Sequence, residues 1–148
     1  MKSDELFLEI KNKISNKEIK KNEKFERNNY KSKIASFNYN LYNEILNREI
    51  KDISIEEIDN KLLIDLKYSL DYFFNKYPTN NPEFDEFVKY ICIYLLFIEK
   101  KPFHPVGLEI KNKILIFKKN SKYYCGLKEK YKEDENSLCK FCVSLSLS

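Results

Sequence analysis

The sequence predicts a mainly α protein, with a bundle-like core of four to five helices and a small C-terminal lobe that contains a β-hairpin. The 148 residues include only two glycines and four prolines, which favours long helices. Over most of residues 1–100, apolar side chains recur at steps of three and four, as on one face of a helix. After Pro105 the pattern changes to short apolar runs typical of strands. We therefore expect a single domain, with a helical core at 1–100 and a Cys/His lobe at 101–148 packed on it.

The first two helices are expected to follow Ser3 and to begin near residue 30. The apolar face of the first is Leu6, Ile10 and Ile14. The apolar face of the second is Tyr30, Ile34, Phe37, Leu41 and Ile45. Between them, Ser15 and Glu18 have the spacing of a capping box, which would start a further helix in the charged stretch that follows.

The next helix has the clearest predicted start in the chain. Ser54 and Glu57 have capping-box spacing, and Ile53 and Ile58 have the spacing of a hydrophobic staple. One face then stays apolar for several turns until Pro78 stops the helix. That face is Ile55, Ile58, Leu62, Leu66, Leu70, Phe73 and Tyr77. Because the aromatic residues of this segment share helical spacing with leucines, we expect core and rim packing rather than a base-stacking surface for Tyr68, Tyr72, Phe73, Phe74 and Tyr77.

The last long helix is predicted to be the central one. Asn81 is expected to cap it, with Pro82 at its first position. The segment is apolar nearly all round as far as Ile98, which is typical of a helix packed on several sides. Residues 99–102 should end it. We expect one shared core that contains Leu62, Leu66, Leu70, Phe87, Ile91 and Leu95.

In the lobe, residues 113–117 and 122–124 are predicted to form a hairpin around a four-residue turn at 118–121. Lys118, Lys119 and Lys122 should form a solvated tip of that hairpin without a dedicated ligand. The lobe is expected to pack against the helix at 84–98.

The lobe also carries the candidate chemistry. It holds the only histidine of the chain, His104, which lies between two prolines that keep it extended and outside the preceding helix. Cys125 ends a predicted strand, and Cys139 with Cys142 forms a C-x-x-C. Three thiols and one imidazole match the ligand set of a structural Cys₃His zinc site. We therefore predict that His104, Cys125, Cys139 and Cys142 bind one zinc ion.

The same residues allow other chemistry, which the sequence favours less. An iron–sulfur cluster would have to recruit Cys92, whose place in the apolar run indicates core packing. A thioredoxin-like C-x-x-C normally opens a helix after a strand, unlike this one. His104 could activate Cys125 as a nucleophile, although neither residue has a sequence context typical of such a pair. Glu99 and Glu109 flank His104 and are expected to be solvated.

The charge pattern allows nucleic-acid binding without favouring it. The net charge is +4, and residues 111–132 hold eight basic residues against one acidic residue. Such a block could attract phosphate. Arginine, the usual bidentate reader of phosphate and guanine, is confined to Arg27 and Arg48.

Several function classes lack their sequence signatures. The chain has no nucleophile elbow, P-loop or dinucleotide fingerprint. No apolar run reaches the length of a membrane span, and the N-terminal residues do not have the pattern of a signal peptide. We expect a cytoplasmic protein without a membrane contact, whose cysteines stay reduced.

Residues 97–107, 123–125 and 138–142 resemble an uncharacterised family of methanogenic archaea known as domain of unknown function 2115. The resemblance rests on His-Pro, Tyr-Tyr-Cys and C-x-x-C in this order, and it covers roughly the last third of the chain. Gly126 stands where the family pattern has a proline. The resemblance implies an archaeal cytoplasmic protein and implies no activity.

The leading hypothesis is a metal-stabilised interaction module that contacts a partner protein. The rival is a metal- or thiol-dependent enzyme with its site at the same four residues, where a catalytic zinc would keep one coordination position for water. A third hypothesis is a lysine-rich nucleic-acid-binding protein, whose affinity would depend strongly on salt.

Overall fold

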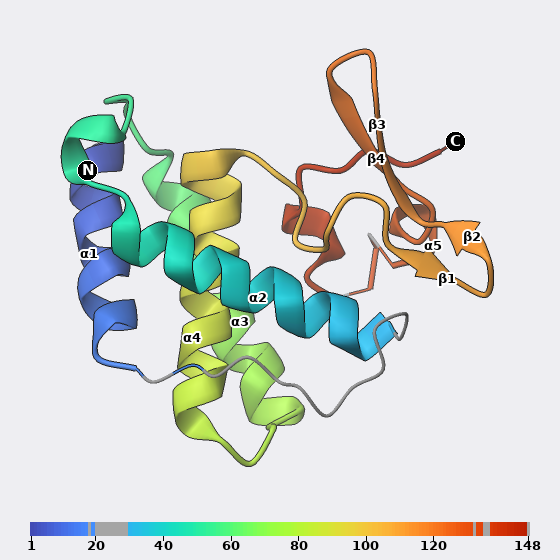
Figure 1. Ribbon diagram of the computed structural model, residues 1–148, viewed down its shortest axis with the longest axis horizontal. Helices are drawn as coiled ribbons and strands as arrows, with labels where there is room; N and C mark the ends of the chain where they lie inside the picture. The colour runs from blue at the N-terminus through green and yellow to red at the C-terminus, as the bar shows by residue number, and fades with distance from the viewer. Residues whose placement is uncertain (18, 20–29, 132, 135–136, 148) are drawn as a thin grey trace.

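The structure, a computed structural model, describes residues 1–17, 19, 30–131, 133–134 and 137–147. Its helical part is built around α4 (Pro82–Tyr94), which contacts α1 (Ser3–Ser15), α2 (Tyr30–Asn47) and α3 (Asn60–Lys76). Figure 1 shows α2 crossing in front of α4 and reaching from α1 to the C-terminal lobe. The expected mainly α chain with a central fourth helix is confirmed.

The start of α4 follows from local signals. Asn81 is its N-cap and accepts a hydrogen bond from the Phe84 backbone N–H at 3.2 Å, while Pro82 occupies the first helical turn. The missing N–H of a proline costs nothing at this position, because the first helical N–H groups have no intrahelical partner. Both expected roles are confirmed.

The predicted core is confirmed at five of its six positions, since Leu66, Leu70, Phe87, Ile91 and Leu95 are buried in one cluster. Leu62 is only half-buried and lies at the edge of that cluster, whereas its neighbour Leu63 is buried. One tyrosine of α3 departs further from expectation. Tyr68 is 73% exposed and faces solvent, whereas Tyr72 and Tyr77, each 48% exposed, lie at the rim that was also expected.

The predicted start of α3 at Ser54 is wrong. The helix begins at Asn60 with Asp59 as its N-cap, whose carboxylate accepts from the Leu62 N–H at 3.1 Å. The segment before Asp59 is extended because it pairs with the N-terminus of the chain: the Ile58 N–H donates to the Met1 carbonyl at 3.1 Å. Ile53 and Ile58 are buried as a staple pair would be, but Ile55 is 63% exposed.

Ser3 holds this pairing together. Its backbone N–H donates to the Glu56 carbonyl at 2.9 Å. Its hydroxyl donates to the Ser54 carbonyl at 2.6 Å and accepts from the Glu56 N–H at 2.8 Å. The residue is 3% exposed, so no solvent replaces these partners if the hydroxyl is removed.

Ser3→Ala should therefore lower the free energy of unfolding by about 1–2 kcal/mol, because the Glu56 N–H loses its acceptor. Urea melts of the variant give the value. The matched control is Ser15→Ala, whose hydroxyl makes an exposed bond to the Asn12 carbonyl at 3.1 Å and should cost less than about 0.5 kcal/mol. Equal costs for the two variants would contradict the role of Ser3.

Ser15 was also predicted to form a capping box with Glu18. It is the last residue of α1 and bonds back into that helix, so it ends a helix rather than preceding one. Its expected partner Glu18 lies outside the described residues, as does the whole charged stretch at 20–29.

The end of α4 carries a polar network that the sequence did not indicate. After Tyr94 the helix widens into one π turn, Leu95–Glu99, and ends in a left-handed Lys100 (φ 55°), within the expected range. Arg48 donates to both the Tyr94 hydroxyl (2.8 Å) and the Glu99 carboxylate, and Tyr94 donates to Glu99 at 2.9 Å. The Glu99 side chain is only 12% exposed, which corrects the expectation of a solvated charge; Glu109 is exposed as expected.

The lobe contains two short hairpins instead of one. β1 (Glu109–Ile110) pairs with β2 (Lys113–Ile114), and β3 (Ile116–Lys119) pairs with β4 (Lys122–Cys125). Both turns have two residues with positive φ, at Lys111-Asn112 and Asn120-Ser121. Two-residue turns of this hand match the twist of the strands, so the predicted four-residue turn is wrong. The three lysines of the β3–β4 tip are exposed, as predicted.

The lobe has its own buried residues and also touches the core. Leu108 and Ile116 are each 2% exposed, while Phe103, Leu138 and Phe141 pack against the main cluster. Within the described residues, no helix is both long enough and apolar enough to cross a membrane.

Candidate functional site

Three cysteines lie in the region where the β3–β4 hairpin pairs with the C-terminal tail. Cys125 is the last residue of β4, and its N–H donates to the Leu145 carbonyl at 2.9 Å. Cys139 opens a single 3₁₀ turn, Cys139–Phe141, that is closed by the Cys142 N–H donating to the Cys139 carbonyl at 3.2 Å. Pairing of the tail with β4 therefore brings the C-x-x-C turn to the strand end that carries Cys125.

The thiols influence one another electrostatically. Burial raises the pKa of Cys139, a hydrogen bond with Ser137 lowers it, the nearby Cys125 and Cys142 raise it, and Lys128 lowers it. The net effect is a raised pKa, so without a metal the Cys139 thiol stays protonated at neutral pH. A protonated thiol is a poor nucleophile, which weighs against a thiol-dependent enzyme with Cys139 as its nucleophile.

His104 lies beside this cluster but is not joined to it. The backbone N–H of the preceding residue, Phe103, donates to the Cys142 sulfur at 3.4 Å. His104 itself is exposed to solvent, although the surrounding protein desolvates its ring enough to lower the pKa of His104. In the part of the chain that the structure describes, no three His, Cys, Asp or Glu side chains form a group that could hold a metal ion.

Cys92 approaches the same junction from the core. It lies on α4, is 7% exposed and belongs to the main hydrophobic cluster, as core packing requires. Burial raises the pKa of Cys92 to about 12, with a further contribution from Cys142. Cys142 therefore lies between Cys92 in the helical core and Cys139 in the lobe.

Two residues near the thiols were missed at the sequence level. Lys128, in the short helix α5 (Lys128–Tyr131), donates to the Cys142 carbonyl and brings a positive charge to the cluster. Ser144 is 1% exposed, and its hydroxyl has no hydrogen-bond partner among the described residues. A lysine three residues past a strand and a serine in a Ser-Leu tail carry no local signal, because the tail pairing that places them is long-range.

Comparison with known proteins finds a matching family and related archaeal proteins. A sequence profile described as "Uncharacterized protein conserved in archaea (DUF2115)" matches residues 5–147. A UPF0305 protein of Methanocaldococcus jannaschii is 32% identical over 161 aligned positions, which cover 99% of this chain and 98% of that protein. A UPF0305 protein of Methanothermobacter thermautotrophicus is 28% identical over 114 positions, which cover 76% of this chain and 70% of that protein. No solved structure matches the chain significantly.

Proposed function

This chain belongs to the archaeal family DUF2115, and we propose that it acts as a metal-stabilised interaction module. Its C-terminal lobe would bind zinc through Cys125, Cys139, Cys142 and His104. The observation that carries the proposal is the position of the C-x-x-C turn. That turn is held against the strand end that bears Cys125 and against the loop that bears His104, by the Cys125–Leu145 and Phe103–Cys142 hydrogen bonds.

Zinc binding requires the side chains to rotate into place. The described thiols and imidazole are not in a ligating arrangement, and zinc needs sulfur at about 2.3 Å and nitrogen at about 2.0–2.1 Å. The Phe103–Cys142 and Cys125–Leu145 hydrogen bonds join the loop before His104 and the end of β4 to the C-terminal tail, so we expect closure to need side-chain movement more than refolding. Exposure of His104 leaves its ring free to turn toward the thiols.

The surroundings of the thiols suit a bound metal. Ligating thiolates are negatively charged, and Lys128 supplies a positive charge next to Cys142. Ligands of a metal are usually hydrogen-bonded by further groups of the protein. The unpartnered Ser144 hydroxyl is a buried donor of the kind such a site uses.

The interaction part of the proposal rests on the surface of the lobe. Large apolar side chains on the lobe are exposed although the lobe is small, namely Val106, Ile114, Leu127, Leu145 and Leu147. Where such side chains form one contiguous patch, they are typical of a protein-binding surface, and we propose that those of the lobe do so. A metal that fixes the lobe would hold this surface in one shape for a protein partner.

Zinc titration of the full chain, purified without oxygen and stripped by a chelator, tests the proposal. We expect one zinc per chain by elemental analysis, and slower amide hydrogen exchange after residue 101 when zinc is bound, because a ligand that binds only the folded site stabilises it. The core should keep its protection without zinc. At a hundredfold excess over Kd, the gain is about 2.7 kcal/mol.

Cysteine variants make the titration specific. Cys139→Ser and His104→Ala should lose tight zinc binding, whereas Cys92→Ser, the matched control in the core, should keep it. Zinc retained by Cys139→Ser would refute the site. Zinc lost only from the cysteine variants, and not from His104→Ala, would indicate a three-thiol site with one open position and favour the metal-dependent enzyme.

A further inference from the structure

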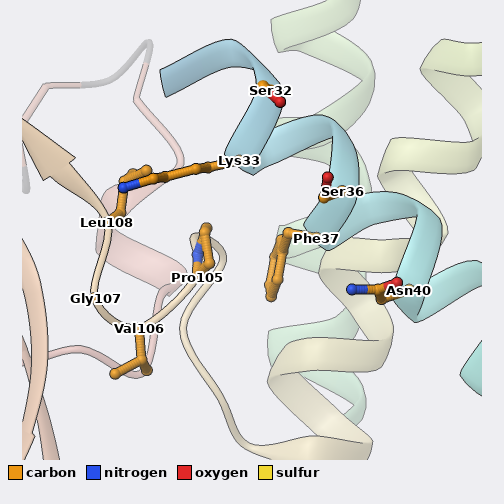
Figure 2. Close-up of a pocket in the computed structure, with 9 residues that line it drawn as sticks. All are labelled: Ser32, Lys33, Ser36, Phe37, Asn40, Pro105, Val106, Gly107 and Leu108. Atoms are coloured by element: carbon orange, nitrogen blue, oxygen red, sulfur yellow. The ribbon is translucent and has the colours of Figure 1, made fainter. Parts of the chain in front are cut away.

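A cavity separate from the cysteine cluster lies between α2 and the loop at 105–108. Its volume is about 380 Å³, within the range of small-molecule sites. Figure 2 shows Phe37 opposite Pro105 across this space, with the Lys33 side chain extended toward the loop. The N-terminal half of α2, which projects from the core toward the lobe in Figure 1, forms one wall.

Besides Phe37, the α2 wall carries four hydrogen-bond donors that have no other partner in the described structure. Ser32, Lys33, Ser36 and Asn40 line the cavity, and none of them has a side-chain hydrogen bond or ion pair with another described residue. Asp and Glu are absent from the described lining. The first turn of α2 also lacks an acidic residue, so the positive end of the helix dipole adds to the charge of Lys33. This wall therefore suits an anion.

The opposite wall is apolar and held in place. The Gly107 N–H donates to the Ile116 carbonyl at 2.7 Å, and the Leu108 N–H donates to the Pro105 carbonyl at 3.2 Å, which ties the loop to β3. Gly107 has φ +87°, and a Cβ built there would meet nothing within 4 Å. Its left-handed backbone therefore has open space beside it.

We propose that this cavity binds a small phosphate monoester with a flat apolar body. A phosphate offers three acceptor oxygens and up to two negative charges, which suit the Lys33 ammonium group and the neutral donors nearest to it on α2 better than a carboxylate does. The flat body of the ester would lie between Phe37 and the loop. The site contains none of the proposed zinc ligands, so the two proposals can fail independently.

The direct test is calorimetric titration of the full chain with phenyl phosphate, together with amide chemical shifts of the labelled protein. We expect saturable binding with a Kd on the order of 1 mM or below, and shifts at residues 32–40 and 105–108. Benzyl alcohol, which has the ring without the charge, should not bind in this range. Absence of saturation by phenyl phosphate, or shifts elsewhere only, would overturn the proposal.

Variants separate the charged group of the α2 wall from its aromatic ring. Lys33→Met should weaken phenyl phosphate binding by about tenfold to a hundredfold, because a charge-assisted bond is lost. Lys61→Met removes the same charge from an exposed position on α3 and should leave the affinity unchanged. Phe37→Leu should weaken phenyl phosphate binding and leave binding of inorganic phosphate unchanged. Equal losses in the two lysine variants would mean non-specific attraction to a basic surface and would refute the site.

Discussion

Leu66→Ala is expected to lower the free energy of unfolding by about 2–5 kcal/mol, the largest effect we predict. Leu66 is fully buried on the face of α3 that packs against α4, where Ile91 and Phe87 are also buried. Removing its isopropyl group costs the transfer free energy of the lost atoms and leaves a space that neighbouring helices fill only in part. Ile91→Ala should have a cost of the same order, since Ile91 is 2% exposed on the facing helix.

The matched control lies on the same helix. Ile64 is 65% exposed, so Ile64→Ala removes a similar side chain without opening a cavity. Alanine also has the higher helix propensity, and the control should change stability by less than about 0.5 kcal/mol. Urea melts of the three variants check the prediction. A cost for Leu66→Ala no greater than that for Ile64→Ala would mean that the buried face of α3 is assigned wrongly.

Features with a local cause could be predicted from the sequence. Asn81 and Pro82 start α4 through bonds within their own turn, so the residue types are sufficient. Leu66 and Leu70 on α3 pack against the apolar run of α4. This contact follows from the sequence because α3 has a single apolar face to bury and α4 is apolar nearly all round.

Features decided by contacts between distant segments could not be predicted. Ser54 and Glu57 have capping-box spacing but do not start a helix, because the backbone of Glu56 is hydrogen-bonded to Ser3. The cavity beside Lys33 exists only because α2 extends to the loop after Pro105, a contact that no local pattern records. The exposed ring of Tyr68 shows the converse, since aromatic residues at helical spacing can line the outer face as well as the inner one.

The candidate zinc site falls between these two cases. The residue types and the C-x-x-C spacing are local, and they identify the four candidate ligands. Their approach depends on the tail pairing beside β4 and on the Phe103–Cys142 contact, which are long-range. Residue types could therefore suggest the chemistry, while Lys128 and Ser144 emerged only from the structure.

The second large effect is expected at the network of Arg48, Tyr94 and Glu99. Tyr94 is fully buried, and the Arg48 and Glu99 side chains are 26% and 12% exposed. A pair at this depth should be worth more than a surface ion pair, because removing one partner leaves the other charge poorly solvated. Glu99 would retain Tyr94 at 2.9 Å and Lys101 at 3.4 Å, which limits the loss.

Arg48→Met should therefore cost about 2–3 kcal/mol in a urea melt at neutral pH, and Arg48→Lys should cost less because it keeps the charge. Lys51→Met is the matched control. Its ion pair with Glu49 is exposed at both side chains, at 78% and 62%, so its cost should stay below about 0.5 kcal/mol. A cost for Arg48→Met as small as that for Lys51→Met would show that the network adds nothing to stability.

The pH dependence gives an independent check of the same network. Burial alone would raise the pKa of Glu99, but the Tyr94 hydrogen bond and the charges of Arg48 and Lys101 outweigh it and leave the pKa below its ordinary value. A carboxyl group with a lowered pKa in the folded state stabilises the fold above its unfolded pKa, and this contribution disappears as the pH falls through the folded pKa. The stability difference between the natural chain and Arg48→Met should therefore shrink as the pH falls and Glu99 takes up its proton, because a neutral carboxyl group no longer needs the guanidinium group. A difference that stays constant from pH 7 to about pH 3 would mean that Arg48 stabilises the fold through packing alone.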